Sequence, residues 1–181
     1  MRGKIAALIL SMFLLMGNAV SSMATEYDHE TEVRGMNFAW KVAEESLHVK
    51  LTARTTGWIG IGFNPTDQMK GANYIIGYVN KGKVEIRDDY GDETRNHKED
   101  EKLGGTVDLT VVGGAEKGGS TTLEFSIPLD SGDQYDSKLD PEGETVVLLS
   151  YGGKRDSFRS KHKYKAILKV NLSSGSVEEV K

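Results

Sequence analysis

Two residues of this sequence have metal-ligand chemistry and stand in loops rather than in regular segments. Met69 follows a glycine-rich apolar segment and lies among polar neighbours in residues 66–72. A methionine gains little in such a loop unless apolar matter covers it, and its thioether suits haem iron or copper. His162 lies in residues 152–163, which are rich in Gly, Lys and Arg. The residues alone also allow a second interpretation, in which Met69 closes the end of a hydrophobic core.

The other histidines and two glycines give further indications. We expect His29, His48 and His97 to be solvated surface residues, because none stands at a tight metal-ligand spacing such as H-x-x-x-H. Gly60 and Gly62 remove side chains from one face of the apolar segment just before Met69. Glycine inside a strand often marks the close approach of a ligand or of backbone, so we expect these two residues to clear space for a ligand.

Several kinds of chemistry are excluded by what the sequence lacks. It has no cysteine, which excludes disulfides, thiolate metal sites, iron–sulfur clusters, a cysteine nucleophile and covalently attached c-type haem. It has no G-x-S-x-G nucleophile motif, and its glycine pairs at 113–114 and 118–119 do not open a helix. The sequence therefore gives no strong indication of a catalytic site, and we do not expect this chain to be an enzyme.

The charges exclude one class of partner and mark one segment. The 181 residues carry a formal net charge of -4, which argues against nucleic-acid binding. Residues 88–102 are dense in charged side chains, so we expect a long solvated loop there. A calcium site in that loop is the alternative, because hard cations take several oxygen ligands, although the spacing is not that of an EF-hand.

The first residues have the three-part pattern of a secretory signal. Arg2 and Lys4 precede an apolar run over residues 5–16, and Ser-Met-Ala at 22–24 provides a small-x-small cleavage site. The run is shorter than the roughly 20 residues of a membrane span. We expect residues 1–24 to be a signal peptide and the protein to be extracytoplasmic (periplasmic or secreted), with no membrane span after cleavage. An uncleaved N-terminal anchor is the alternative.

The remaining chain consists of short apolar or alternating segments separated by Gly, Asp and Asn. In residues 47–52 apolar and polar residues alternate, which places His48 on the face opposite the apolar row. Nine such segments predict an all-β antiparallel sandwich over residues 25–172, followed by a polar, frayed tail over 173–181. The segments are 36–42, 47–52, 58–63, 72–79, 83–87, 107–112, 121–127, 145–151 and 164–172.

These segments, in this order, resemble the DOMON family, and specifically its haem-binding, cytochrome-type branch. The resemblance covers nearly all of the chain after the signal, from about residue 35 to residue 172. It is carried by Phe38-Ala39-Trp40, the strand at 47–53, Gly57-Trp58-Ile59-Gly60-Ile61-Gly62-Phe63-Asn64, Met69, the strand at 73–79, Asp88-Asp89-Tyr90, and His162 just before 164–172.

The resemblance implies a fold, a cofactor and its ligands. Cytochrome-type members are immunoglobulin-like β-sandwiches that hold haem b between a methionine after the Gly-Trp strand and a histidine before the last strand. In this sequence those positions are Met69 and His162. Without cysteine the haem would be non-covalent. A Met/His pair leaves no open iron position, which favours one-electron transfer.

The resemblance further implies the surroundings of the haem and a partner. We expect an apolar slot for the macrocycle and a basic loop facing its propionates; the alternative is that the basic residues only form a solvated loop. The expected wall residues are Trp58, Gly60, Gly62, Phe63, Tyr74, Ile76, Tyr151 and Phe158, and the basic residues are Lys154, Arg155, Arg159, Lys161 and Lys163. The expected partner, besides haem, is a separate redox protein that the sequence does not identify.

Two other functions fit the same sequence. One is a non-haem module for a carbohydrate or another small ligand, for which Trp40, Trp58 and Tyr90 would supply aromatic surface. The other is a haem carrier or sensor, which would release its haem quickly to an acceptor.

Overall fold

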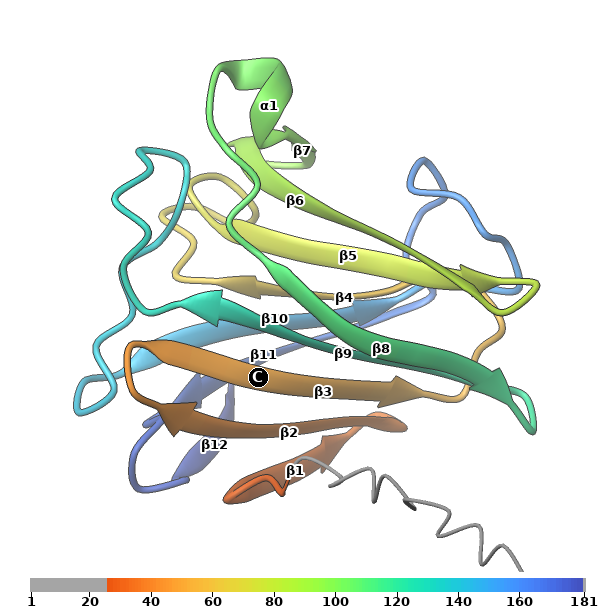
Figure 1. Ribbon diagram of the computed structural model, residues 1–181, viewed down its shortest axis with the longest axis horizontal. Coiled ribbons are helices and arrows are strands. Elements are labelled where there is room, and N and C mark those ends of the chain that lie inside the picture. Colours follow the sequence, from red (N-terminus) through yellow and green to blue (C-terminus); the bar gives the residue numbers. More distant parts are fainter. Residues whose placement is uncertain (1–25, 181) are drawn as a thin grey trace, which may run out of the picture.

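The computed structural model describes residues 26–180 and consists almost entirely of strands in two antiparallel sheets (Figure 1). The five-stranded sheet has the order β1 (His29–Val33), β2 (Met36–Ala43), β3 (Ser46–Ala53), β9 (Ser120–Pro128), β8 (Thr110–Lys117). The seven-stranded sheet has the order β12 (Val177–Val180), β11 (Tyr164–Val170), β10 (Thr145–Tyr151), β4 (Ile59–Phe63), β5 (Asn73–Asn80), β6 (Lys83–Glu93), β7 (Asn96–Glu99). One short helix, α1 (Asp100–Leu103), follows β7. The predicted antiparallel β-sandwich is confirmed.

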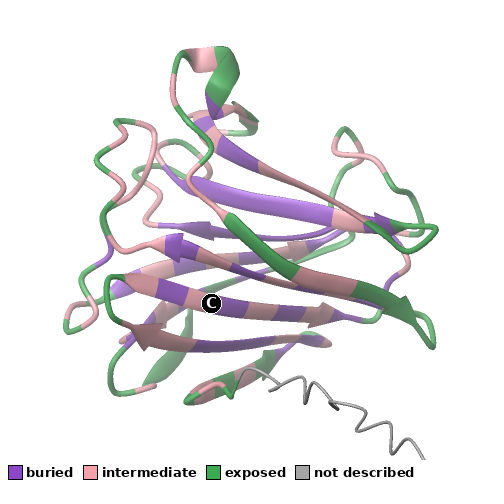
Figure 2. Ribbon diagram, viewed as in Figure 1, coloured by how far each residue is buried: buried purple, intermediate pink, exposed green. Residues whose placement is uncertain are grey.

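The core lies between the two sheets and follows from strand alternation. In β3 every second residue is buried, which Figure 2 shows as alternating colours along the strand. His48 lies on the more exposed face, as its spacing predicts. Phe38 and Trp40 of β2 are fully buried, with ring centroids 4.5 Å apart. The indole Nε1 of Trp40 donates to the Leu172 carbonyl at 3.0 Å, which ties β2 to the segment after β11.

Two predictions at the edges of the sheets are wrong, and one strand there was not predicted. Residues 88–102 are not one solvated loop, because β6 pairs with β5 as far as Tyr90, continues to Glu93 and is followed by β7 and α1. The tail does not fray throughout, since β12 pairs with β11. His29 begins β1, which pairs with β2 and was not expected. In each case pairing with a neighbouring strand overrides a polar local sequence.

The predicted signal peptide and the question of a membrane span concern the N-terminal segment and the helices. The predicted signal peptide, residues 1–24, lies outside the described residues. Within residues 26–180 the structure contains no helix that is long and apolar enough to cross a membrane.

Strand β4 sets the positions of the two loops that carry Met69 and His162. Its first residue, Ile59, pairs with Tyr151, after which residues 152–163 leave β10. Its last residue, Phe63, pairs with Asn73, and residues 64–72 connect the two strands at that end. The two loops therefore lie at opposite ends of β4 (Figure 1), which is about 13 Å long at the usual rise per residue.

Candidate functional site

The outer face of the seven-stranded sheet is covered at its centre. In β4 the side chains of Ile59, Ile61 and Phe63 belong to the core, so alternation places Gly60 and Gly62 on the outer face. A Cβ atom at Gly62 would clash with the ring of Tyr74 on β5. Tyr74 is only 8% exposed, so its ring fills the space that Gly62 leaves.

Gly60 is less crowded than Gly62. A Cβ atom there would lie 3.3 Å from the Ile75 carbonyl and 3.4 Å from Ile76, which is a tight but tolerable contact. Ile76, at 4% exposure, covers this part of β4. The two glycines thus let the side chains of β5 lie flat on β4.

Residues 152–163 are attached to the start of β4 by a set of short contacts. The Gly152 amide donates to the Trp58 carbonyl at 2.9 Å, and the Trp58 indole donates to the backbone carbonyl and the hydroxyl of Ser160 at 3.1 and 2.8 Å. The Thr55 hydroxyl lies 3.0 and 2.8 Å from the carbonyls of Gly152 and Gly153. These bonds fix both the beginning and the end of the loop that carries His162.

The same loop bends over the outer face of the sheet. The ring of Phe158 lies 4.8 Å from that of Tyr78 on β5, and the Arg87 guanidinium of β6 lies 4.2 Å from the Phe158 ring centroid. These contacts place Phe158, an expected wall residue, over Tyr78 and Arg87 on the outer face of the sheet.

His162 itself is exposed near the end of the loop. Partial burial of its ring, together with the charge of Lys165, lowers its pKa below the usual value for histidine. The neutral imidazole is therefore favoured, and the neutral form is the one that binds metals. Arg155 and Arg159, expected to face propionates, are exposed in the same loop.

Met69 is half-buried at the other end of β4. Its amide donates to the Thr94 carbonyl at 3.3 Å, and the Gly71 amide donates to the Gly91 carbonyl at 2.8 Å. A Cβ atom at Gly91 would clash with the Met69 carbonyl. Gly91 continues the alternation of Arg87 and Asp89 along β6, so the Met69 loop packs against the outer side of that strand.

A polar network adjoins Tyr74 on the outer face. His97 is half-buried, with its Nδ1 atom 2.5 Å from the fully buried Asp89 and its ring centroid 5.5 Å from that of Tyr74. Arg87 bridges Asp89 and Glu99 at 2.5 and 2.7 Å. The prediction that His97 is a solvated residue is wrong, because β7 pairs with β6 and brings the imidazole onto Asp89.

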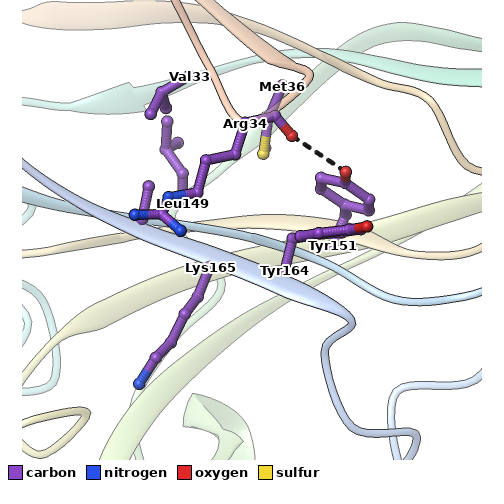
Figure 3. A pocket seen from close by; sticks show the side chains of 8 residues that line it. Val33, Arg34, Met36, Leu149, Tyr151, Tyr164 and Lys165 are labelled. Atoms are coloured by element: carbon purple, nitrogen blue, oxygen red, sulfur yellow. Dashed lines mark hydrogen bonds between the residues drawn. The ribbon is translucent and has the colours of Figure 1, made fainter.

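Two expected wall residues lie on the other side of the sheet. Phe63 is fully buried in the core, and Tyr151, at 6% exposure, also packs there. The Tyr151 hydroxyl donates to the Arg34 carbonyl at 3.1 Å beside a small pocket (Figure 3). That pocket offers about 10 Å³, which is room for one water molecule and far too little for a macrocycle. The structure therefore does not bring Phe63 and Tyr151 together with Tyr74 and Phe158.

The aromatic residues considered for carbohydrate binding are mostly inaccessible. Trp40 is fully buried and Trp58 is 5% exposed, so neither ring offers a stacking surface to a sugar. Tyr90 is half-buried and packs edge-on against Tyr135, with centroids 5.3 Å apart.

The fold and the site define an immunoglobulin-like β-sandwich with a thioether and an imidazole on loops at opposite ends of one central strand. The DOMON domain family model matches residues 33–152, which is most of the described sandwich. The chain belongs to the DOMON family.

Comparison of sequences gives relatives that are much longer than this chain. The chain is 29% identical over 108 residues to "MOXD1 homolog 2" of Drosophila melanogaster, covering 59% of this chain and 14% of the relative. It is 27% identical over 143 residues to "DBH-like monooxygenase protein 1" of Homo sapiens, covering 77% of this chain and 23% of the relative. The chain thus spans less than a quarter of the length of these relatives.

Solved structures share the fold. The cytochrome b domain of pyranose dehydrogenase from Coprinopsis cinerea has a TM-score of 0.58 and 12% identity, covering 77% of this chain and 78% of that one. The cytochrome domain of Myriococcum thermophilum cellobiose dehydrogenase gives the same TM-score and identity, covering 77% and 76%. Both establish likeness of fold.

Proposed function

We propose that this chain is a haem b-binding domain that transfers single electrons, with Met69 and His162 as the axial ligands. The observation that carries the proposal is that these two residues stand on the loops that adjoin the two ends of β4. Solved domains of the same fold are named cytochrome domains, which supports the same assignment.

The donor set and its surroundings fit a non-covalent haem. A thioether and a neutral imidazole are both haem ligands, and the pKa of His162 is shifted in the direction that keeps its ring neutral. Phe158, in the loop that carries His162, supplies a partly exposed aromatic ring next to Tyr78. When bound, haem would supply reversible one-electron chemistry.

The contribution of the protein is to hold the loops and provide charge. Trp58 and Thr55 fix the loop that carries His162, and the backbone around Gly91 fixes the loop that carries Met69. The basic loop provides cations for propionates, namely Lys154, Arg155, Arg159, Lys161 and Lys163. We propose that the domain itself is not catalytic and exchanges electrons with a separate protein outside the cytoplasm, after removal of residues 1–24.

The test is the visible spectrum of the purified protein after addition of haem. We expect a low-spin b-type spectrum in the reduced state, and a high-spin spectrum or loss of haem in Met69→Ala and in His162→Ala. The controls are Lys70→Ala, beside Met69, and His48→Ala, on the five-stranded sheet; both should keep the low-spin spectrum. A low-spin spectrum that survives both ligand substitutions would reject the assigned ligands.

Two further outcomes separate the alternatives. Failure of the folded protein to bind haem, together with measurable saccharide binding, would favour a carbohydrate module. Rapid transfer of haem to an apo-acceptor would favour a haem carrier. The position of the N-terminus in secreted material tests the signal peptide.

A further inference from the structure

Three aspartates from distant parts of the chain meet beside α1. Asp88 lies in β6, Asp100 is the first residue of α1, and Asp136 lies in the segment between β9 and β10. Each offers a carboxylate oxygen, and these oxygens lie within 4.8 Å of one another. Asp100 is fully buried and Asp88 is 2% exposed, so the fold encloses two of the three carboxylates. Figure 1 shows α1, which begins at Asp100, beside β6 and β7.

Several oxygens in this cluster have no hydrogen-bond partner. Within residues 26–180, both carboxylate oxygens of Asp100 and Oδ1 of Asp88 are buried and unpaired. The other oxygen of Asp88 accepts one bond, from the Asp108 amide at 2.9 Å. A buried carboxylate without a donor or a counter-charge is expensive, because it has lost its hydration without replacement.

A neutral side chain adds an independent indication. Asn73, at the start of β5, is 4% exposed and donates its Nδ2 to Oδ1 of Asp136. Its own amide oxygen is buried and has no partner among the described residues. Through its bond to Asp136, Asn73 thus adds an unpaired amide oxygen to the unpaired oxygens of Asp88 and Asp100, and a hard cation satisfies such a set of oxygens.

The basic side chains of β6 and α1 form ion pairs with carboxylates outside this cluster. Arg87 bridges Asp89 and Glu99 on the outer face, and Lys102 pairs with Glu99 at 2.6 Å.

We propose that Asp88, Asp100 and Asp136, with the amide oxygen of Asn73, bind a divalent cation, and that the cation is Ca²⁺. The donors are all oxygens, which disfavours zinc and copper, and Ca²⁺ accepts irregular sets of six to eight oxygens more readily than Mg²⁺ does. Backbone carbonyls and water would complete the coordination. The bound ion would hold α1 and the segment after β9 against β6.

The experiment compares calcium binding by two variants of the same helix. Chelator-treated, haem-free protein is titrated with CaCl₂ by calorimetry, and its melting is followed with and without Ca²⁺. We expect one Ca²⁺ per chain and a higher melting temperature with Ca²⁺. Asp100→Asn should weaken the affinity at least about tenfold, since the charge count sets the affinity of such sites. Glu101→Gln, at an exposed position beside it, should bind as the native chain does.

Each outcome is decisive because Asp100→Asn is expected to fold. Asparagine has nearly the shape of aspartate and relieves the repulsion among the three carboxylates, so without Ca²⁺ the variant should melt no lower than the native chain. Absence of calcium binding by the folded native chain would overturn the proposal, and so would equal affinities of the two variants. Binding of Mg²⁺ as tight as that of Ca²⁺ would overturn the choice of ion. None of these results depends on haem.

Discussion

The contact between Gly62 and Tyr74 makes a quantitative prediction about the outer face. A methyl group at Gly62 would enter the Tyr74 ring, with Cδ1 at 2.7 Å and Cζ at 2.9 Å. A methyl group at Gly60, two residues earlier on the same face, would have its nearest neighbour at 3.3 Å. Gly62→Ala and Gly60→Ala therefore form a matched pair in one strand.

The expected free energies follow from three contributions. Alanine for glycine in a strand gains about 0.5–1 kcal/mol, because it loses less backbone freedom on folding. At position 62 overpacking costs about 1–3 kcal/mol, and displacing Tyr74 from His97 costs up to about 1 kcal/mol more. We expect Gly62→Ala to lose about 1–3 kcal/mol, and Gly60→Ala to change stability by less than about 1 kcal/mol.

Urea unfolding of the haem-free protein, followed by tryptophan fluorescence, measures both variants. For a domain of this size, 1 kcal/mol corresponds to a melting shift of about 2–4 °C. A double-mutant cycle with Tyr74→Ala isolates the contact, because the cost of Gly62→Ala should largely vanish once the ring is gone. Equal stability of Gly62→Ala and Gly60→Ala, or an undiminished cost in the Tyr74→Ala background, would refute the reasoning.

Three other substitutions test single hydrogen bonds and ion pairs at sites of different burial. Trp58→Phe removes the two hydrogen bonds to Ser160 and should cost about 1–2 kcal/mol, with faster trypsin cleavage in residues 152–163 as the local readout. Arg87→Met leaves the fully buried Asp89 without its arginine and should cost about 3–5 kcal/mol in urea unfolding. Arg34→Ala removes an exposed ion pair and should change stability by less than about 1 kcal/mol, as the same assay would show.

Strands with one buried face could be predicted from the sequence. The alternation of apolar and polar residues in 47–52 predicts a strand with one buried face. The structure has β3 there, with His48 turned away from the core. The apolar run before Met69 is β4, whose two faces are both covered. The resemblance to the DOMON family is likewise confirmed.

Elements that depend on their neighbours could not be predicted in the same way. Asp88 and Asp89 indicate a solvated loop when only adjacent residues are considered. In the fold they lie in β6 opposite Ile75 and Tyr74 of β5, Arg87 forms an ion pair with Asp89, and His97 hydrogen-bonds to it. Counter-charges brought by strand pairing are invisible to a local pattern, and so is the meeting of Asp88 with Asp100 and Asp136.

The candidate haem face and the aspartate cluster share the same two strands. On β5, Asn73 points toward the cluster and Tyr74 toward the outer face. On β6, Asp88 points toward the cluster and Asp89 toward the outer face. Since neighbouring residues of a strand point to opposite sides, one pair of strands can carry both sites without either occupying the space of the other. The Met69 loop is bonded to Gly91, three residues beyond Asp88 on β6. An ion that fixes Asp88 would thus also stiffen the strand against which the Met69 loop packs.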